Sequence, residues 1–252
     1  MGLIYAIANQ KGGVGKTTTT VNLAAALASM GQKTLVVDLD QQCNATVGLG
    51  LDRSERPSAY EVLSAEVTLS DAARPSGIEN LWIVPASRDL AGAAVELPNL
   101  ERPNLRLKEQ LGPVADLFDF ILMDCPPALG PVTVNALVAA DRVIVPVQAE
   151  YLALEGLAEF MATMASVQRE LNPRLGLSGI VVTMHDERTR LAQDVERDLR
   201  EHFGDEVYRN VIPRTVRLAE APSYGIPVTD YAPVSRGAGA YIALANEVQT
   251  RG

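Results

Sequence analysis

KGGVGKTT, residues Lys11 to Thr18, joins a short apolar run, Ile4–Ala8, to an Ala- and Leu-rich helical segment over residues 16–30. Glycines in such a loop let backbone N–H groups converge on an anion. The N-terminus of the following helix adds an electrostatic field that favours negative charge. A strand, a glycine-rich loop and a helix in this order therefore predict a phosphate-binding loop.

Two side chains of the loop suit a nucleoside triphosphate and its metal ion. The Lys16 ammonium supplies a cation for the β- and γ-phosphates, and the Thr17 hydroxyl can ligate Mg²⁺. The usual pattern, G-x-x-x-x-G-K-[ST], fails at its first position, where Gln10 replaces glycine and Lys11 follows. A glycine-rich turn without a ligand is the alternative, but the Gly-Lys-Thr triplet and the additional lysine in this context favour a nucleotide site.

The rest of the chain alternates between strand-like and helix-like segments. Apolar runs predict further strands at residues 34–38, 81–84, 118–123, 142–147, 179–182 and 207–212. Helices are expected at residues 60–63, 69–73, 105–111, 132–139, 150–171, 191–202 and 238–248, and a loop over residues 41–57. This alternation predicts one α/β domain over residues 1–252, with a doubly wound, mainly parallel sheet flanked by helices. Sites of such folds lie at the carboxyl ends of strands.

Composition limits both the core and the partners. Hydrophobic residues make up 47% of the 252 residues but aromatic residues only 5%, so the core must be mainly aliphatic. The formal net charge of −9 argues against a general nucleic-acid binder, because phosphate contacts need clustered basic residues. Every basic residue from Arg174 onward is arginine, however, so a local arginine patch is compatible with the acidic total.

Cysteine usage and hydropathy indicate the compartment. Cys43 and Cys125 form no close pair, which disfavours a disulfide framework and a zinc site within the chain. Reduced thiols fit the cytoplasm. The N-terminal apolar run lacks a basic leader, and no stretch reaches the roughly 18 apolar residues of a membrane span. We therefore expect a cytoplasmic protein that does not use a membrane.

The loop KGGVGKTT resembles the deviant Walker A motif of the ParA/MinD superfamily of P-loop ATPases. The likeness covers almost the whole chain and is strongest to the ParA/Soj chromosome-partitioning ATPases. It rests on five further segments: VDLDQQCNAT (37–46), ILMDCPP (121–127), PVQAEYLALEGL (146–157), VTMHDERT (182–189) and VIPRTVRLAEAPSYGIPV (211–228). A single motif would be weak, whereas six in order are specific. The resemblance implies a P-loop NTPase fold of the deviant Walker A type.

The resemblance also implies that ATP and Mg²⁺ are the cofactors. The residues then expected to bind the nucleotide are Lys11, Gly12, Gly13, Val14, Gly15, Lys16, Thr17, Thr18, Asp124, Met184 and Pro213. The metal is expected at Thr17, Asp38 and Asp124, with Asp124 as the Walker B acid at the end of an apolar strand. Met184 and Pro213 belong to segments that resemble the family's adenine pocket, where backbone groups make most of the contacts.

Lys11, Lys16 and Asp40 are the residues that the resemblance places in hydrolysis. Lys11 matches the family's signature lysine, which reaches the partner's phosphates in a nucleotide-sandwich dimer, in the manner of an arginine finger. Asp40 matches the residue that positions the catalytic water. The family usually reads D-x-D-P-Q-G-N, whereas this chain reads DLDQQCN from Asp38 to Asn44. Loss of the proline and the glycine is expected to change the stiffness of this loop and the hydrolysis rate.

Arginines near the C-terminus match residues that family members use for nonspecific duplex binding. Arg188 and Arg217 carry the match, and Arg236 widens the expected patch. Further candidates are Arg190, Arg209 and Arg214. Phosphate contacts of this kind give affinity without sequence reading. Because two copies double a weak patch, DNA binding is expected to depend on an ATP-driven homodimer.

The expected function is that of a partition ATPase. Its ATP-bound dimer coats nonspecific double-stranded DNA and is released when a ParB-type centromere-binding protein stimulates hydrolysis, so that a chromosome or plasmid is segregated in the nucleoid. Basal hydrolysis is expected to be slow. A MinD-like membrane-cycling ATPase is one alternative, although the end AYIALANEVQTRG lacks an apolar–basic face. A metabolic P-loop ligase of the dethiobiotin-synthetase type and a nucleotide-binding scaffold without hydrolysis are the others.

Overall fold

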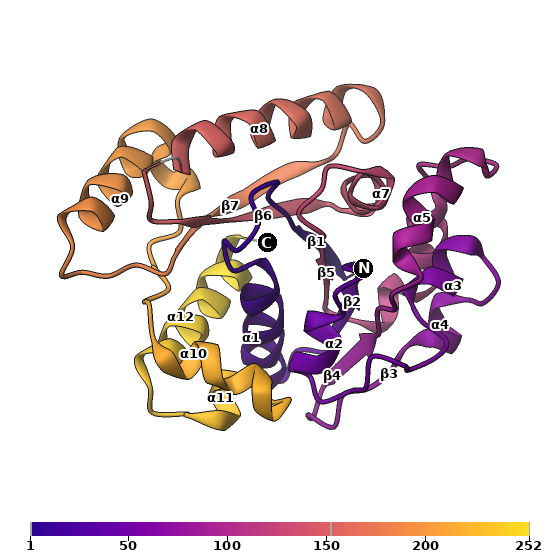
Figure 1. Ribbon diagram of the computed structural model, residues 1–252, viewed down its shortest axis with the longest axis horizontal. Helices are drawn as coiled ribbons and strands as arrows, with labels where there is room; N and C mark the ends of the chain where they lie inside the picture. Colours follow the sequence, from indigo (N-terminus) through magenta and orange to yellow (C-terminus); the bar gives the residue numbers. More distant parts are fainter. Residues whose placement is uncertain (1, 152, 252) are drawn as a thin grey trace.

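A seven-stranded sheet forms the centre of the computed structural model, which describes residues 2–151 and 153–251 (Figure 1). Its strands are β1 (Leu3–Ile7), β2 (Thr34–Asp38), β3 (Arg74–Pro75), β4 (Leu81–Val84), β5 (Phe120–Asp124), β6 (Arg142–Gln148) and β7 (Gly176–Thr183). Their order across the sheet is β3-β4-β2-β5-β1-β6-β7, and every described pair is parallel except β3 with β4. The predicted doubly wound, mainly parallel sheet is confirmed, and its extent as one domain stays a prediction.

Helices cover both faces of this sheet (Figure 1). One face carries α1 (Lys16–Ser29), α2 (Asn44–Gly48), α10 (Val216–Glu220), α11 (Val228–Tyr231) and α12 (Arg236–Arg251). The other carries α3 (Ala59–Ser64), α4 (Leu69–Ala72), α5 (Leu90–Glu96), α6 (Arg106–Leu111), α7 (Pro131–Ala139), α8 (Ala153–Glu170) and α9 (Arg190–Phe203). Short 3₁₀ segments are η1 (Leu97–Asn99), η2 (Gly112–Leu117), η3 (Gly204–Glu206) and η4 (Ala221–Tyr224).

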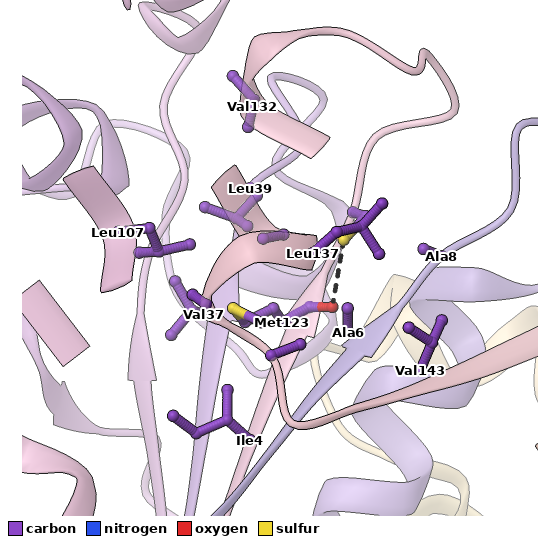
Figure 2. Close-up of a cluster of buried hydrophobic side chains, with 14 of the residues drawn as sticks. Ile4, Ala6, Ala8, Val37, Leu39, Leu107, Met123, Val132, Leu137 and Val143 are labelled. Atoms are coloured by element: carbon purple, nitrogen blue, oxygen red, sulfur yellow. Dashed lines mark hydrogen bonds between the residues drawn. The ribbon is translucent and has the colours of Figure 1, made fainter. Parts of the chain in front are cut away.

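Alternating side chains along each strand divide the core into two layers. Ile4 and Ala6 of β1 join the layer beneath α3 to α9, while Tyr5 and Ile7 join the layer beneath α1 and α12. Figure 2 shows part of the first layer, in which strand residues face side chains of α6 and α7. Because both faces of the parallel strands are buried, these strands read as largely apolar runs, which made them recognisable in the sequence.

Several local expectations were wrong or incomplete, and α5, α10 and α11 were not predicted. The expected loop over residues 41–57 contains α2, and the antiparallel strand β3 was not predicted. The helix expected over residues 150–171 is α8, and Leu152 lies outside the described residues. Helix α2 has only five residues, too few for a helical period to emerge from the sequence.

Residues 207–212 do not form the expected strand. The segment makes an isolated bridge between Val207 and Ile180, and its backbone then turns to helix α12. Glu247 accepts hydrogen bonds from the backbone N–H groups of Arg209 and Asn210, at 2.8 and 3.3 Å. The backbone N–H groups of Tyr208 and Ile212 still donate to Ile180 and Val182 of β7, at 2.9 and 2.8 Å, so the carboxylate contacts interrupt a ladder that would have extended the sheet. Apolar composition alone predicted a strand, because it carries no information about a competing acceptor on a distant helix.

Gly179 marks a close approach between β7 and this segment. A Cβ atom at residue 179 would lie 2.7 Å from the Tyr208 ring and 2.9 Å from the Glu206 carbonyl oxygen. Tyr208 is buried and shares a 2.7 Å hydrogen bond with Ser178, and the Arg251 guanidinium lies 4.3 Å from its ring centre. The absence of a side chain at residue 179 therefore allows the segment that contains Glu206 and Tyr208 to pack against β7.

Gly179→Ala is expected to lower the free energy of unfolding by about 1–3 kcal/mol, because the new methyl group overlaps both ring and backbone atoms. Chemical denaturation measures the change. Gly156→Ala in α8 is the matched control, since nothing lies within 4 Å of its Cβ position, and it should stabilise the protein by about 0.5–1 kcal/mol. Equal effects of the two substitutions would contradict the packing described for β7.

Candidate functional site

The loop between β1 and α1 has the backbone that the sequence predicted. Gly13 and Gly15 adopt left-handed conformations, with φ of 75° and 88°, which L-residues rarely adopt. Gly15 is the N-cap of the 14-residue helix α1, and no side chain caps the helix. The free N–H groups of its first turn and the helix dipole therefore favour an anion at this end.

The two lysines of the loop occupy different environments. Lys16 is buried, and its Nζ donates a 3.1 Å hydrogen bond to the Lys11 carbonyl oxygen. Burial lowers the pKa of Lys16, and the Asp124 carboxylate opposes this shift. The Lys11 side chain is partly exposed, with its Nζ 3.7 Å from Oε2 of Glu150. Lys16 is thus fixed inside the loop. Lys11 lies at the mouth of the loop, in a partly exposed ion pair with Glu150 that another anion can replace.

Two carboxylates that were predicted to bind the metal lie side by side at the carboxyl edge of the sheet. The parallel register of β2 and β5 pairs Asp38 with Asp124, and both side chains are fully buried. Asp124 accepts hydrogen bonds from the hydroxyls of Thr17, at 2.8 Å, and Thr20, at 3.0 Å. Asp38 accepts from both the backbone N–H and the hydroxyl of Thr46, at 2.8 and 2.7 Å.

Burial dominates the electrostatics of both carboxyl groups, although the Lys16 ammonium is close enough to interact with Asp124. Burial raises the pKa of Asp124 to about 8, and the neighbouring Asp38 adds to the shift. Burial also raises the pKa of Asp38 to about 6, against the hydrogen bonds from Thr46. A divalent cation beside Asp124 and the Thr17 hydroxyl would relieve this cost, and carboxylate, hydroxyl and phosphate oxygens are ligands that Mg²⁺ prefers. The residues present therefore fit a magnesium–nucleotide complex.

The loop that carries Asp40 begins directly after β2. The Asp38 carboxylate accepts a 3.1 Å hydrogen bond from the backbone N–H of Asp40, and the Asp40 carboxylate accepts one of 2.9 Å from Gln42. Cys43, at the position where the family usually has glycine, keeps a left-handed backbone with φ of 56°. A non-glycine residue there costs roughly 1–2 kcal/mol. Cys43 thus keeps the backbone conformation of a glycine turn, and its backbone is strained as a result.

A cavity of about 540 Å³ opens beside the phosphate loop. It is lined by Gly15, Thr18, Thr183, Met184, Arg188, Ile212, Pro213, Arg214, Thr215, Val216, Leu218, Ala219 and Tyr241. The Thr183 hydroxyl donates a 2.7 Å hydrogen bond to the Val14 carbonyl oxygen, which ties this wall to the loop. Met184 has a φ of 52°, and His185 bridges to Pro213. The predicted residues Met184 and Pro213 therefore share a cavity large enough for a purine base.

The three arginines predicted to contact DNA lie on separate elements near this cavity. Arg188 precedes α9 and lines the cavity, Arg217 lies on α10, and Arg236 begins α12 (Figure 1). All three side chains are more than half exposed. The sequence reasoning missed Thr20 and Thr46, whose hydroxyls hold Asp124 and Asp38. Threonines are frequent in this chain, and no local signal separates these two from the others.

The described part of the chain holds no group of three or more His, Cys, Asp and Glu side chains that could bind a metal ion without further ligands. None of its helices is long and apolar enough to cross a membrane.

Comparison with known proteins places this geometry among relatives of similar length. Residues 2–177 match a family model described as an AAA domain. The chromosome-partitioning ATPase Soj of Thermus thermophilus is 53% identical over 249 residues, which cover 98% of this chain and 95% of that protein. The sporulation initiation inhibitor protein Soj of Bacillus subtilis is 48% identical over 254 residues, with both proteins fully covered. The chromosome partitioning protein ParA of Caulobacter vibrioides is 47% identical over 251 residues, or 98% and 94% of the two chains.

Solved structures with the same fold have been crystallised with adenine nucleotides. Cobyrinic acid a,c-diamide synthase from Mycobacterium smegmatis, with bound ADP and magnesium, has a TM-score of 0.86 and 38% identity, covering 98% of this chain and 93% of its own. The septum site-determining protein MinD from Pyrococcus horikoshii, complexed with Mg-ADP, has a TM-score of 0.80 and 30% identity, covering 98% and 96%. Both confirm the predicted fold.

Asp124→Asn is expected to stabilise the nucleotide-free protein by about 1–3 kcal/mol near pH 8. The pKa of Asp124 is raised in the folded state, so its contribution to stability is intact below about pH 4 and is lost as the pH rises toward 8. Thermal unfolding at several pH values should show the gap between variant and parent widening in that direction. A variant that is less stable at every pH would contradict the unfavourable burial of this carboxylate.

Proposed function

We propose that this chain, which belongs to the ParA/Soj family of chromosome-partitioning ATPases, is an ATP-dependent switch that moves DNA. It binds ATP with Mg²⁺, pairs with a second copy across the two nucleotides, and is held on double-stranded DNA in that state. Hydrolysis to ADP and phosphate ends the state. The observation that carries the proposal is the meeting of an uncapped helix end, buried Lys16 and the Asp38–Asp124 pair at one edge of the sheet.

The residues around the phosphate loop divide the work of binding and hydrolysis. The loop N–H groups and Lys16 would bind the triphosphate, while Thr17 and Asp124 would hold a magnesium ion, which would supply positive charge for the phosphate oxygens. Asp38 holds the backbone N–H of Asp40 and so positions that side chain for the attacking water. Water adds to the γ-phosphorus as its bond to the ADP oxygen breaks, and the proton of the water passes to phosphate. Positioning and charge, without a covalent intermediate, account for slow basal turnover.

Lys11 gives the site its dependence on a second copy. Lys16 already serves the phosphates of its own chain, and Lys11 stands at the loop mouth beside Glu150. We propose that Lys11 exchanges Glu150 for the partner's phosphates when two chains pair. An exposed ion pair of this kind is worth no more than about 1 kcal/mol, so a triphosphate displaces it readily.

Arg188, Arg217 and Arg236 are proposed to bind duplex phosphates, and a ParB-type protein to stimulate hydrolysis. The names of two relatives favour this assignment, since the Thermus thermophilus protein at 53% identity and the Caulobacter vibrioides protein at 47% identity are named as chromosome-partitioning proteins. The protein then works in the cytoplasm on the nucleoid, with a chromosome or plasmid as cargo. A small-molecule ligase would not need exposed arginines on three neighbouring elements.

Lys16→Ala is expected to abolish ATP binding and DNA retention together, because it removes the cation from the triphosphate site. Arg217→Ala should leave ATP binding intact and weaken retention on nonspecific duplex DNA by about tenfold or more, since each phosphate contact contributes to affinity. Nucleotide titration and DNA binding with ATP, ADP and no nucleotide measure both properties. Arg169→Ala, a partner of Glu170 at the end of α8, is the control for loss of one exposed arginine.

Equal loss of DNA retention in Arg169→Ala and Arg217→Ala would contradict the assigned DNA surface. Retention that is the same with ATP, with ADP and without nucleotide would contradict the switch itself.

A further inference from the structure

Each arginine assigned to the DNA surface is held by a carboxylate of the same chain. Arg188 makes a bidentate contact with Asp186, at 2.9 and 2.8 Å. Arg217 lies 2.9 Å from Glu220. Arg236 contacts Glu187, 49 positions earlier in the sequence. The arginines therefore do not present free positive charge to a duplex.

The pairs are built from elements that pack against one another, so the charge balance belongs to the fold. The Arg236–Glu187 contact joins α12 to the segment before α9. Glu220 at the end of α10 also accepts a 3.1 Å hydrogen bond from the Tyr231 hydroxyl of α11. Each carboxylate is thus held beside its arginine by contacts or connections that do not involve DNA.

The result is a surface of nearly balanced charge. Its basic residues are Arg188, Arg214, Arg217 and Arg236, and its acidic residues are Asp186, Glu187 and Glu220. Four cations against three anions leave a net charge of +1 on these residues of one chain, within a protein whose formal net charge is −9. One copy therefore offers DNA little net attraction, and two copies held together offer twice as much on one duplex.

Each of these arginines must give up its carboxylate partner before it can bind a DNA phosphate, and this weakens the phosphate contact. When an arginine leaves its carboxylate for a DNA phosphate, the duplex releases a cation but the freed carboxylate attracts one. The gain from counterion release is then partly cancelled. Exposed pairs are individually weak, so DNA can displace the carboxylate, but the contact contributes less affinity than a free arginine would.

We infer that Glu187 and Glu220 compete with DNA for Arg236 and Arg217. This competition is a restraint that keeps the DNA affinity of a single chain too low for it to stay bound. The inference rests on the proposed DNA-binding function and deepens it. Pairing of two copies then decides between retention and release, because neither copy binds strongly alone. Asp186 has a second task, since its carboxylate also accepts a 3.1 Å hydrogen bond from the backbone N–H of Arg188 and shapes the turn.

The test is the double variant Glu187→Gln/Glu220→Gln. Glutamine keeps the size of the side chain and an acceptor oxygen, and removes only the charge. DNA binding by the double variant and the parent is measured with ATP, ADP and no nucleotide over a series of salt concentrations. With ATP, the variant should bind about tenfold more tightly near 0.1 M salt, and its salt dependence should steepen by roughly 0.9 for each arginine freed. It should also gain measurable binding with ADP.

Glu66→Gln/Glu101→Gln is the matched control. Both residues are exposed, they lie in segments beside α3 and η1, and their substitution changes the net charge by the same amount. Light scattering with ATP checks that each double variant still forms the same assembly as the parent, and thermal unfolding checks its fold.

The outcomes separate the restraint from the function on which it rests. If the parent binds DNA with ATP and the Glu187/Glu220 variant binds no more tightly, or only as much more tightly as the control, the restraint is wrong. If the parent does not bind DNA in any nucleotide state, the proposed function fails and the restraint with it. A gain confined to the Glu187/Glu220 variant, with the steeper salt dependence, supports both.

Discussion

Negative charge buried at the carboxyl ends of β2 and β5 governs the arrangement of the whole site. Parallel pairing in register brings Asp38 and Asp124 together, and the surrounding core keeps water from them. The hydroxyls of Thr17 and Thr20 in α1 donate hydrogen bonds to Asp124, and the hydroxyl of Thr46 in α2 donates one to Asp38. The sheet, the phosphate loop and the loop that carries Asp40 therefore meet at a point where a divalent cation would offset the buried negative charge.

The same edge of the sheet also explains how nucleotide state can reach distant surfaces. Thr183 joins the end of β7 to Val14 of the phosphate loop, and the next residues lead to Arg188. One wall of the cavity and the Arg188 part of the proposed DNA surface are thus parts of one continuous segment. A nucleotide that fills the cavity rests on the elements from which the arginines project, so binding and retention share a structural support.

Sequence patterns predicted the residues that lie at the centre of the site, but they did not predict the residues that hold those side chains in place. Gly15, Lys16 and Asp124 could be predicted because a glycine-rich turn and an apolar run ending in an acid are local signals. Thr20 and Thr46 could not, since their roles arise from hydroxyl contacts across the fold. The segment at 207–212 had the composition of a strand, but the Glu247 carboxylate on α12 accepts the backbone N–H groups of Arg209 and Asn210 in its middle. Competition between distant acceptors is not visible in a local window.

Mass in solution tests the central claim most directly, because the proposed switch requires two chains to close over two magnesium-bound triphosphates. Light scattering should give 27.0 kDa for the protein with ADP or without nucleotide. With ATP and Mg²⁺ together, in a variant such as Asp40→Ala that slows hydrolysis, it should give twice that mass, and removal of Mg²⁺ by a chelator should restore the single chain. A mass that stays at one chain in every condition, or at two chains regardless of nucleotide and metal, would contradict the account.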